Sequence, residues 1–364
     1  MKKHLIAAAV AAAVAVPAAA QVTVYGVIDQ AFGVQDNGAT ASATVEPSTV
    51  TNFQSLLATQ RLGFRGSEDL GGGLKANFVI EGGLQQGTGS ASTARYQRWT
   101  RATYVELEGG FGKVQLGWMD LGTTNIDDAV SQAGNLGAMF TQADAGDITN
   151  ATGNGDGLGN DNANGINFIT PSFNGVTVEF GYKPRHLIAA ESSGVASKAQ
   201  GANAATQESQ MGVRVDYRNG PLLVAVGRTQ GDSEDGPTFD RKLTALGVSY
   251  NAGVVSVGFA RVEAEPSSTV EHEYNLLSAA VPMGNGLALH GVYQTAKANG
   301  ANEKATGYTL AVTKALSKRT TAYAAYSDLD NKGANAGYSM RGTGSASAVN
   351  TDPSAFAVGI RHSF

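Results

Sequence analysis

Alternation of apolar and polar residues with a period of two is the feature that most limits what this chain can fold into. Val176, Val178 and Phe180 share one face of an extended segment, whereas Thr177 and Glu179 lie on the other. The same pattern recurs in sixteen segments and continues to the C-terminus. Side chains of a β-strand alternate between its two faces with this period. The sequence therefore predicts an all-β protein.

The lengths of the connections separate a membrane barrel from a secreted β-sandwich, in which strands alternate in the same way. Seven connections are short and rich in turn-forming residues, such as Asn174-Gly175 and Asn219-Gly220. The other eight are long and polar, at roughly 36–53, 86–95, 120–164, 184–206, 230–241, 264–270, 297–303 and 328–352. This strict succession predicts sixteen antiparallel strands with every long loop at one end, which is the layout of a transmembrane β-barrel.

The overall composition excludes several other classes of protein. A helical membrane protein needs runs of about 20 apolar residues, and the nearest approach is residues 5–20. The chain has no cysteine among its 364 residues, which excludes a disulfide scaffold, a thiolate metal site and a cysteine nucleophile. Only 16% of residues are charged, and 47 are glycine. This composition fits a barrel whose lipid-facing surface excludes charge.

Residues 1–20 have the layout of a signal peptide. Lys2 and Lys3 precede an apolar stretch that Pro17 ends, and three alanines stand before Gln21. The apolar stretch is too short to cross a bilayer as a helix. Residues 21–364 are then expected to form the barrel, with 24 basic and 31 acidic side chains and a net charge of −7. Such a chain is not expected to bind nucleic acid, which requires a basic face.

The polar faces of the strands predict a water-filled lumen. Barrels of 16–18 strands enclose water, so charged side chains can face inward without losing hydration. A basic residue on the lipid face would cost about 2–4 kcal/mol at the bilayer midplane. Among the residues expected to line the lumen are Asp29, Lys75, Glu81, Glu179, Arg214 and Asp216. Aromatic residues near strand ends are expected to form interfacial girdles, namely Tyr182, Tyr217, Tyr250, Tyr308 and Phe364.

Five segments in order resemble the general diffusion porins of Gram-negative bacteria, especially their betaproteobacterial branch. They are Val22 to Asp29, Arg61 to Ala76, Phe111 to Gly117, Pro171 to Gly175 and Gly359 to Phe364. The resemblance implies a homotrimer of sixteen-stranded barrels in the outer membrane, in contact with outer-membrane lipid and lipopolysaccharide. It also implies that the third long loop, 120–164, folds into the pore, and that the barrel-assembly machinery reads the terminal Phe364.

The same resemblance implies where the pore is narrowest. Arg61, Arg65 and Arg101 match wall arginines of the family, and Arg98 is adjacent, although strict alternation would turn it away from Arg101. Asp127 and Asp128 are the expected acids of the constriction loop, because they follow the preceding strand closely. Arg61 and Arg65 could instead be ordinary lumen charges paired with Asp29 or Glu81. Asparagine stands at 162 and 164, where the resemblance would place a further basic residue of the wall. The group of basic side chains expected at the constriction is therefore weaker in this chain.

No catalytic motif competes with the channel interpretation. The chain lacks Gly-x-Ser-x-Gly, a phosphate-binding loop and His-Glu-x-x-His, and its five histidines are scattered. No cofactor or metal ion is expected. The leading hypothesis is passive diffusion of small hydrophilic solutes and ions, with a weak preference for anions. The alternatives are a substrate-selective channel of the same fold and an outer-membrane barrel enzyme.

Overall fold

The fold was obtained as a computed structural model. It describes residues 21–36, 38, 48–84, 99, 101–120, 126–132, 163–184, 209–232, 240–267, 270–299, 303–333 and 351–364. The predicted signal peptide, Arg98 and most of the loop 120–164 lie outside this set. In the described part, no helix is long and apolar enough to cross a membrane.

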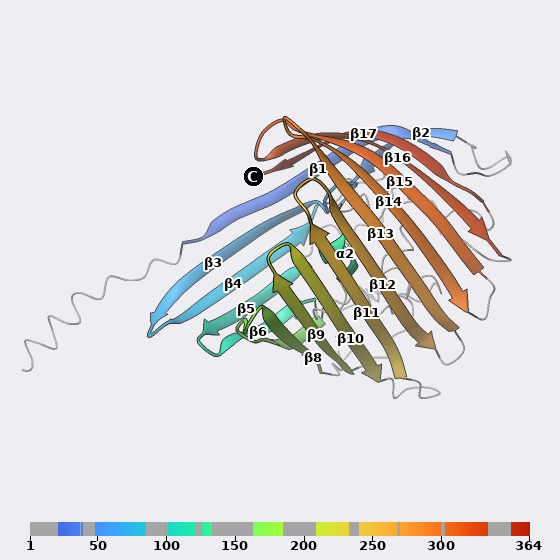
Figure 1. Ribbon diagram of the computed structural model, residues 1–364. Coiled ribbons are helices and arrows are strands. Elements are labelled where there is room, and N and C mark those ends of the chain that lie inside the picture. Colours follow the sequence, from blue (N-terminus) through green and yellow to red (C-terminus); the bar gives the residue numbers. More distant parts are fainter. Residues whose placement is uncertain are drawn as a thin grey trace, which may run out of the picture.

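The described strands form one closed antiparallel sheet (Figure 1). Its first half comprises β1 (Thr23–Asp36), β2 (Ser48–Gln54), β3 (Arg61–Gly71), β4 (Leu74–Gly83), β5 (Ala102–Gly109), β6 (Gly112–Met119), β7 (Ala163–Ile169) and β8 (Val176–Lys183). Its second half comprises β9 (Ser209–Asn219), β10 (Leu222–Asp232), β11 (Asp240–Asn251), β12 (Ser256–Ser267), β13 (Val270–Gly284), β14 (Leu287–Asn299), β15 (Glu303–Ala315), β16 (Thr320–Lys332) and β17 (Ser354–Ser363). The sheet closes because β1 pairs with β17 on one side and with β2 and β3 on the other.

Seventeen strands make sixteen positions around the barrel, because β2 and β3 together occupy one position. Both pair with β1, β2 with its loop half and β3 with its turn half. Residues 55–60 leave the strand between them, and Ser55 has a positive φ of 61°. The sixteen-stranded antiparallel barrel that the sequence predicts is thus confirmed, and the interruption of its second position is new.

Some expected boundaries were wrong. The connections 264–270 and 297–303 were expected to be long loops, but β12 runs to Ser267, β13 begins at Val270, and β14 and β15 reach Asn299 and Glu303. The strand expected to begin near Tyr96 begins at Ala102. Long barrel strands can extend past the membrane, so polar residues near a strand end do not show where pairing stops.

The short connections form tight turns, as their residues predict. Phe173 and Val176 exchange two backbone hydrogen bonds across Asn174 and Gly175. Both central residues have positive φ, 48° and 84°. Two-residue hairpins of the primed types require this conformation, which asparagine and glycine adopt most readily.

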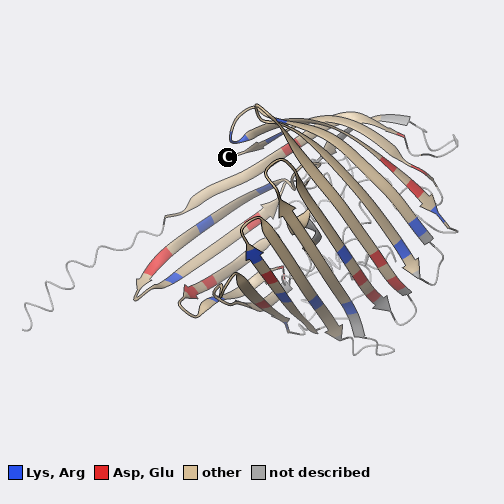
Figure 2. Cartoon of the chain, viewed as in Figure 1, with Lys and Arg blue, Asp and Glu red and all other residues tan. Residues whose placement is uncertain are grey.

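The two faces of the sheet differ as expected for a barrel in a membrane. Large apolar side chains such as Phe32, Val226, Leu246, Leu277 and Leu310 are exposed on the outward face. Figure 2 shows the turn halves of the front strands β10 to β16 largely without charge, with most charged positions in their loop halves. The expected girdle residues Tyr182, Tyr250, Tyr308 and Phe364 are between 41% and 47% exposed, whereas Tyr217 is less so.

Candidate functional site

Two arginines share one carboxylate on the inward face of β3 to β5. Gly63 pairs with Glu81, and Glu81 pairs with Ala102, which follows Arg101. Arg101 Nε lies 2.8 Å from Glu81 Oε1, and Arg61 Nη1 lies 3.6 Å from the same oxygen. Because one carboxylate faces two guanidinium groups, the described side chains of this part of the wall carry an excess of positive charge.

Tyr25 and Arg65 extend this cluster towards the turns. The Tyr25 hydroxyl donates a hydrogen bond of 2.9 Å to Glu81 Oε2. The guanidinium of Arg65 lies 5.1 Å from the centroid of the Tyr25 ring, within the range of a cation–π interaction. Arg61, Arg65, Arg101, Glu81 and Tyr25 are called the arginine cluster below.

Arg361 is a further inward arginine that we did not place in the site from the sequence. It pairs in register with Asp29 across β1 and β17, next to the arginine cluster. It is close enough to Arg61 to repel that side chain electrostatically, as is Arg101. The alternation of the sequence already indicates this inward position, because Arg361 follows Ala357 and Gly359 on the polar face of the last strand.

Asp29 does not line the lumen, contrary to expectation. Its side chain is fully buried beneath residues 55–60. The carboxylate accepts hydrogen bonds from the backbone N–H groups of Leu57 and Ala58, at 2.6 and 2.7 Å, and from the Tyr323 hydroxyl at 2.6 Å. Its role is to hold residues 55–60, called the excursion below, which connect β2 to β3. Their buried backbone donors require an acceptor.

A ladder of paired charges lines the inward wall of β4 to β9, nearer to the turns. Glu106 accepts hydrogen bonds from Asn77, Lys113 and Gln115. Further round the wall, Asn167 donates to Glu179, and Arg214 is paired with Asp216 at 2.7 Å. Glu179, Arg214 and Asp216 share the inward face of their strands, and the exposed Lys75 lies on the same face of β4. Acids and bases alternate here, so the ladder adds little net charge.

Helix α2 (Ile126–Val130) lies against the opposite wall of the barrel. It contacts β10, β11 and β12, and Figure 1 shows it behind β11 and β12. Two glycines allow this close approach: a Cβ on Gly258 would lie 1.9 Å from the Val130 carbonyl oxygen, and one on Gly247 would lie 2.6 Å from Ile126 Cγ2. The chain therefore leaves β6 at Met119 and meets the far wall only seven residues later.

Two side chains of the wall fix the end of α2. The backbone N–H of Gln132 donates to Ser278 Oγ at 3.0 Å. Its carbonyl oxygen accepts from His290 Nδ1 at 3.0 Å, and His290 Nε2 lies 2.9 Å from Thr313 Oγ1. Asp127 and Asp128 belong to α2, but their side chains lie outside the described set.

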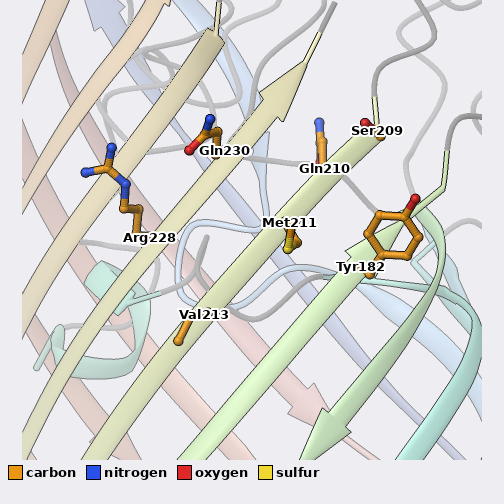
Figure 3. A pocket seen from close by; sticks show the side chains of 7 residues that line it. All are labelled: Tyr182, Ser209, Gln210, Met211, Val213, Arg228 and Gln230. Atoms are coloured by element: carbon orange, nitrogen blue, oxygen red, sulfur yellow. The ribbon is translucent and has the colours of Figure 1, made fainter.

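The outer surface of the barrel also has a shallow depression, over β8 to β10 (Figure 3). Tyr182, Met211, Val213, Arg228 and Gln230 line it. Met211 and Val213 belong to the outward face, so this depression is separate from the lumen and from the arginine cluster. In the described part of the chain, no group of three or more His, Asp or Glu side chains is placed to hold a metal ion.

Comparison with known proteins gives the family. A sequence profile described as Gram-negative porin matches residues 7–359. "Outer membrane porin protein 32" of Delftia acidovorans is 31% identical, and an outer membrane porin protein of Bordetella pertussis is 27% identical, each over the full length of both chains. The solved structure of an "anion-selective porin from Comamonas acidovorans" covers 95% of this chain and 100% of its own, at 26% identity and a TM-score of 0.74.

A closed barrel of sixteen antiparallel positions with a charged lumen and an apolar outer face defines a transmembrane diffusion channel. The chain belongs to the Gram-negative porin family. It is an outer-membrane protein that forms a channel for diffusion, as the sequence predicts.

Proposed function

We propose that the channel admits small hydrophilic solutes and ions with a weak preference for anions, and that the arginine cluster sets this preference. The observation that carries the proposal is the shared carboxylate. Among the described acids, Glu81 is the one that both Arg61 and Arg101 contact, while Arg65 lies over the uncharged ring of Tyr25. The solved neighbour described as anion-selective supports the same sign.

Local charge outweighs the net negative charge of the chain in this proposal. Charges separated by more than about 8 Å are largely screened at physiological ionic strength. A permeating ion is therefore influenced mainly by the wall that it passes closely. Arginine suits this wall because it stays charged at any ordinary pH and its guanidinium is weakly hydrated. The loop segment 120–164, anchored through α2, supplies the opposite side of the constriction, with Asp127 and Asp128 as its acids.

A reversal potential under a KCl gradient across a planar bilayer tests the proposal. The purified protein is expected to show stepwise conductance and a potential of the sign that anion preference gives. Arg61→Ala combined with Arg101→Ala should shift this potential towards cations, because it leaves the Glu81 carboxylate without its two arginine partners. Arg218→Ala is the matched control, since Arg218 is an exposed inward arginine beside the turn. Its reversal potential should change little.

Two results would overturn the assignment. One is a preference for cations that the double substitution leaves unaltered. The other is an equal shift in the Arg218→Ala control, which would mean that charge anywhere along the lumen has the same influence. Homotrimeric assembly, contact with lipopolysaccharide, cleavage of residues 1–20 and recognition by the barrel-assembly machinery stay predictions of the family resemblance. Conductance steps in triplets would support the trimer.

A further inference from the structure

The excursion, residues 55–60, adds extra chain to the inward side of the barrel beside the arginine cluster. Gln54 and Arg61 both pair with β1, at positions that are separated by two residues of that strand. A regular strand would therefore need two residues between them, whereas the chain has six. These residues pack against the inward side chain of Asp29. Residues 57–59 are only partly buried, so the excursion borders the lumen.

The end of the excursion fixes the guanidinium group of Arg61. Arg61 Nε donates a hydrogen bond of 3.1 Å to the backbone carbonyl oxygen of Thr59. Its distance of 3.6 Å to Glu81 is too long for a hydrogen bond. Thr59 is thus the hydrogen-bond acceptor of this guanidinium among the described residues. A carbonyl group is uncharged, so it orients Arg61 without neutralising its positive charge.

Repulsion would move Arg61 if this hydrogen bond were lost. Arg101 and Arg361 both lie close enough to repel it electrostatically. Glu81 attracts Arg61, but it is bound more closely by Arg101, at 2.8 Å. An arginine side chain has many rotamers, and holding it in one of them costs entropy. Without the Thr59 acceptor, the charge of Arg61 would therefore be spread over several positions in the lumen.

The excursion depends in turn on Asp29. Its Oδ2 accepts hydrogen bonds from the backbone N–H groups of both Leu57 and Ala58. Its backbone carbonyl oxygen accepts from the N–H of Ser55 at 3.1 Å. Its own N–H donates to Gln60 Oε1 at 3.2 Å. Both ends and the middle of the excursion are thus attached to this one residue.

We propose that Asp29 is a positioning residue for the anion preference of the channel, and that it acts through the excursion and the Thr59 carbonyl group on Arg61. The inference rests on the role proposed above for the arginine cluster. It gives an acid the effect of favouring anions, because Asp29 is covered by the excursion and fixes a base that faces the lumen. Removal of this negative charge should therefore lower the anion preference, whereas electrostatics alone would raise it.

Reversal potentials of Asp29→Ala and Asp29→Asn under a KCl gradient test the proposal. Both substitutions remove the same charge. Asparagine keeps one side-chain oxygen, which can replace Oδ2 as the acceptor for Leu57 and Ala58, and alanine keeps none. Asp29→Ala should lower the ratio of chloride to potassium permeability about threefold, the influence of a unit charge about 6 Å from an ion in water. Asp29→Asn should not lower this ratio.

Arg61→Ala, added to each variant, shows whether the effect of Asp29 passes through Arg61. In the native and the Asp29→Asn proteins, it should lower the permeability ratio about threefold. In the Asp29→Ala protein, it should change the ratio less than about 1.5-fold, because coupled residues are not additive. Arg101→Ala is the matched control, since Arg101 is bound to Glu81 through both its Nε and its backbone N–H. It should lower the ratio equally in all three proteins.

Three outcomes separate this inference from the proposed function. If Asp29→Ala raises the permeability ratio, or acts like Asp29→Asn, the positioning role is overturned. An equal effect of Arg61→Ala in the native and the Asp29→Ala proteins would also overturn it, and would leave the arginine cluster intact. If Arg61→Ala has no effect in the native protein, the role of the arginine cluster is wrong, and the inference is wrong with it.

A shortened chain takes the place of Asp29→Ala if that variant does not fold. Deletion of residues 56–59 leaves Ser55 and Gln60 as the two residues that continue the strand opposite β1. Asp29→Asn in the same chain avoids an uncovered carboxylate in the lumen. The permeability ratio of this chain should be about threefold lower than that of the native protein. A native ratio in the folded, shortened chain would overturn the proposal.

Discussion

Asp29 stabilises a local departure from the barrel wall. Its carboxylate accepts three short hydrogen bonds, two from the excursion 55–60 and one from Tyr323 on β16. Phe53 and Leu56 are fully buried next to it. A buried acid with this many donors holds the segment in place, because each of those donors would otherwise lack an acceptor.

We expect Asp29→Ala to destabilise the folded barrel by about 3 kcal/mol or more, since it leaves several buried donors unsatisfied. Tyr323→Phe removes only one of the three hydrogen bonds and should cost about 1 kcal/mol. The measurement is the fraction of folded protein during urea titration in lipid vesicles, followed by the gel mobility of unheated samples. Equal effects of the two substitutions would show that Asp29 does not hold the excursion.

For single residues, the direction of a side chain was predictable from the sequence where the strand is regular. Glu179 and Arg214 lie inward as their alternation predicts, because each is in the middle of a strand. Arg101 also turns inward to Glu81, although it precedes the first residue of β5, where alternation gives no rule. The burial of Asp29 was not predictable, since its partner Tyr323 is 294 positions away in sequence.

Among the elements, α2 shows how a short helix can be fixed inside a barrel. Five residues give almost no stability to an isolated helix. Ile126 and Val130 are fully buried against β11 and β12, and Ser278 and His290 bind the backbone of Gln132. The family resemblance of the sequence implied that loop 120–164 folds into the pore. It did not predict which wall would hold α2, because Gly247 and Gly258 look like any other glycine of an alternating strand.

Gly258→Ala should displace α2 into the lumen and reduce the single-channel conductance. The added methyl group would lie 1.9 Å from the Val130 oxygen, so the helix must move away from the wall. Overpacking of this kind costs about 1–3 kcal/mol, which leaves the barrel folded. Gly291→Ala is the control, because its Cβ would meet only Leu310 Cδ2, at 3.8 Å. Normal conductance of folded Gly258→Ala protein would mean that α2 lies away from the narrowest section.

The whole molecule depends on the seam between its first and last strands. β1 pairs with β17 over ten residues, and Gly26 and Phe364 exchange two backbone hydrogen bonds of 3.1 Å at its turn end. The ring of Phe364 covers Gly26, where a Cβ would lie 2.4 Å from the ring. Number and order of strands were predictable because each hairpin is local. The closure joins residues more than 300 positions apart, and the sequence indicates it only indirectly, through the succession of short turns and long loops and through the family resemblance.

Substitutions on the last strand can distinguish a role of Phe364 in packing from a role in assembly of the barrel. Phe364 and Phe356 are both outward, about half-exposed rings on the last strand, but only Phe364 lies at the turn end of the seam, paired with Gly26. Replacing either by alanine removes similar outward apolar area, so both variants should fold to similar extents in lipid vesicles without other proteins. In cells, we expect Phe364→Ala to lower the amount of folded barrel several-fold more than Phe356→Ala does, because the terminal ring is accessible before the seam closes. The measurement is the folded fraction in isolated outer membranes. Equal losses in cells would assign Phe364 to packing alone.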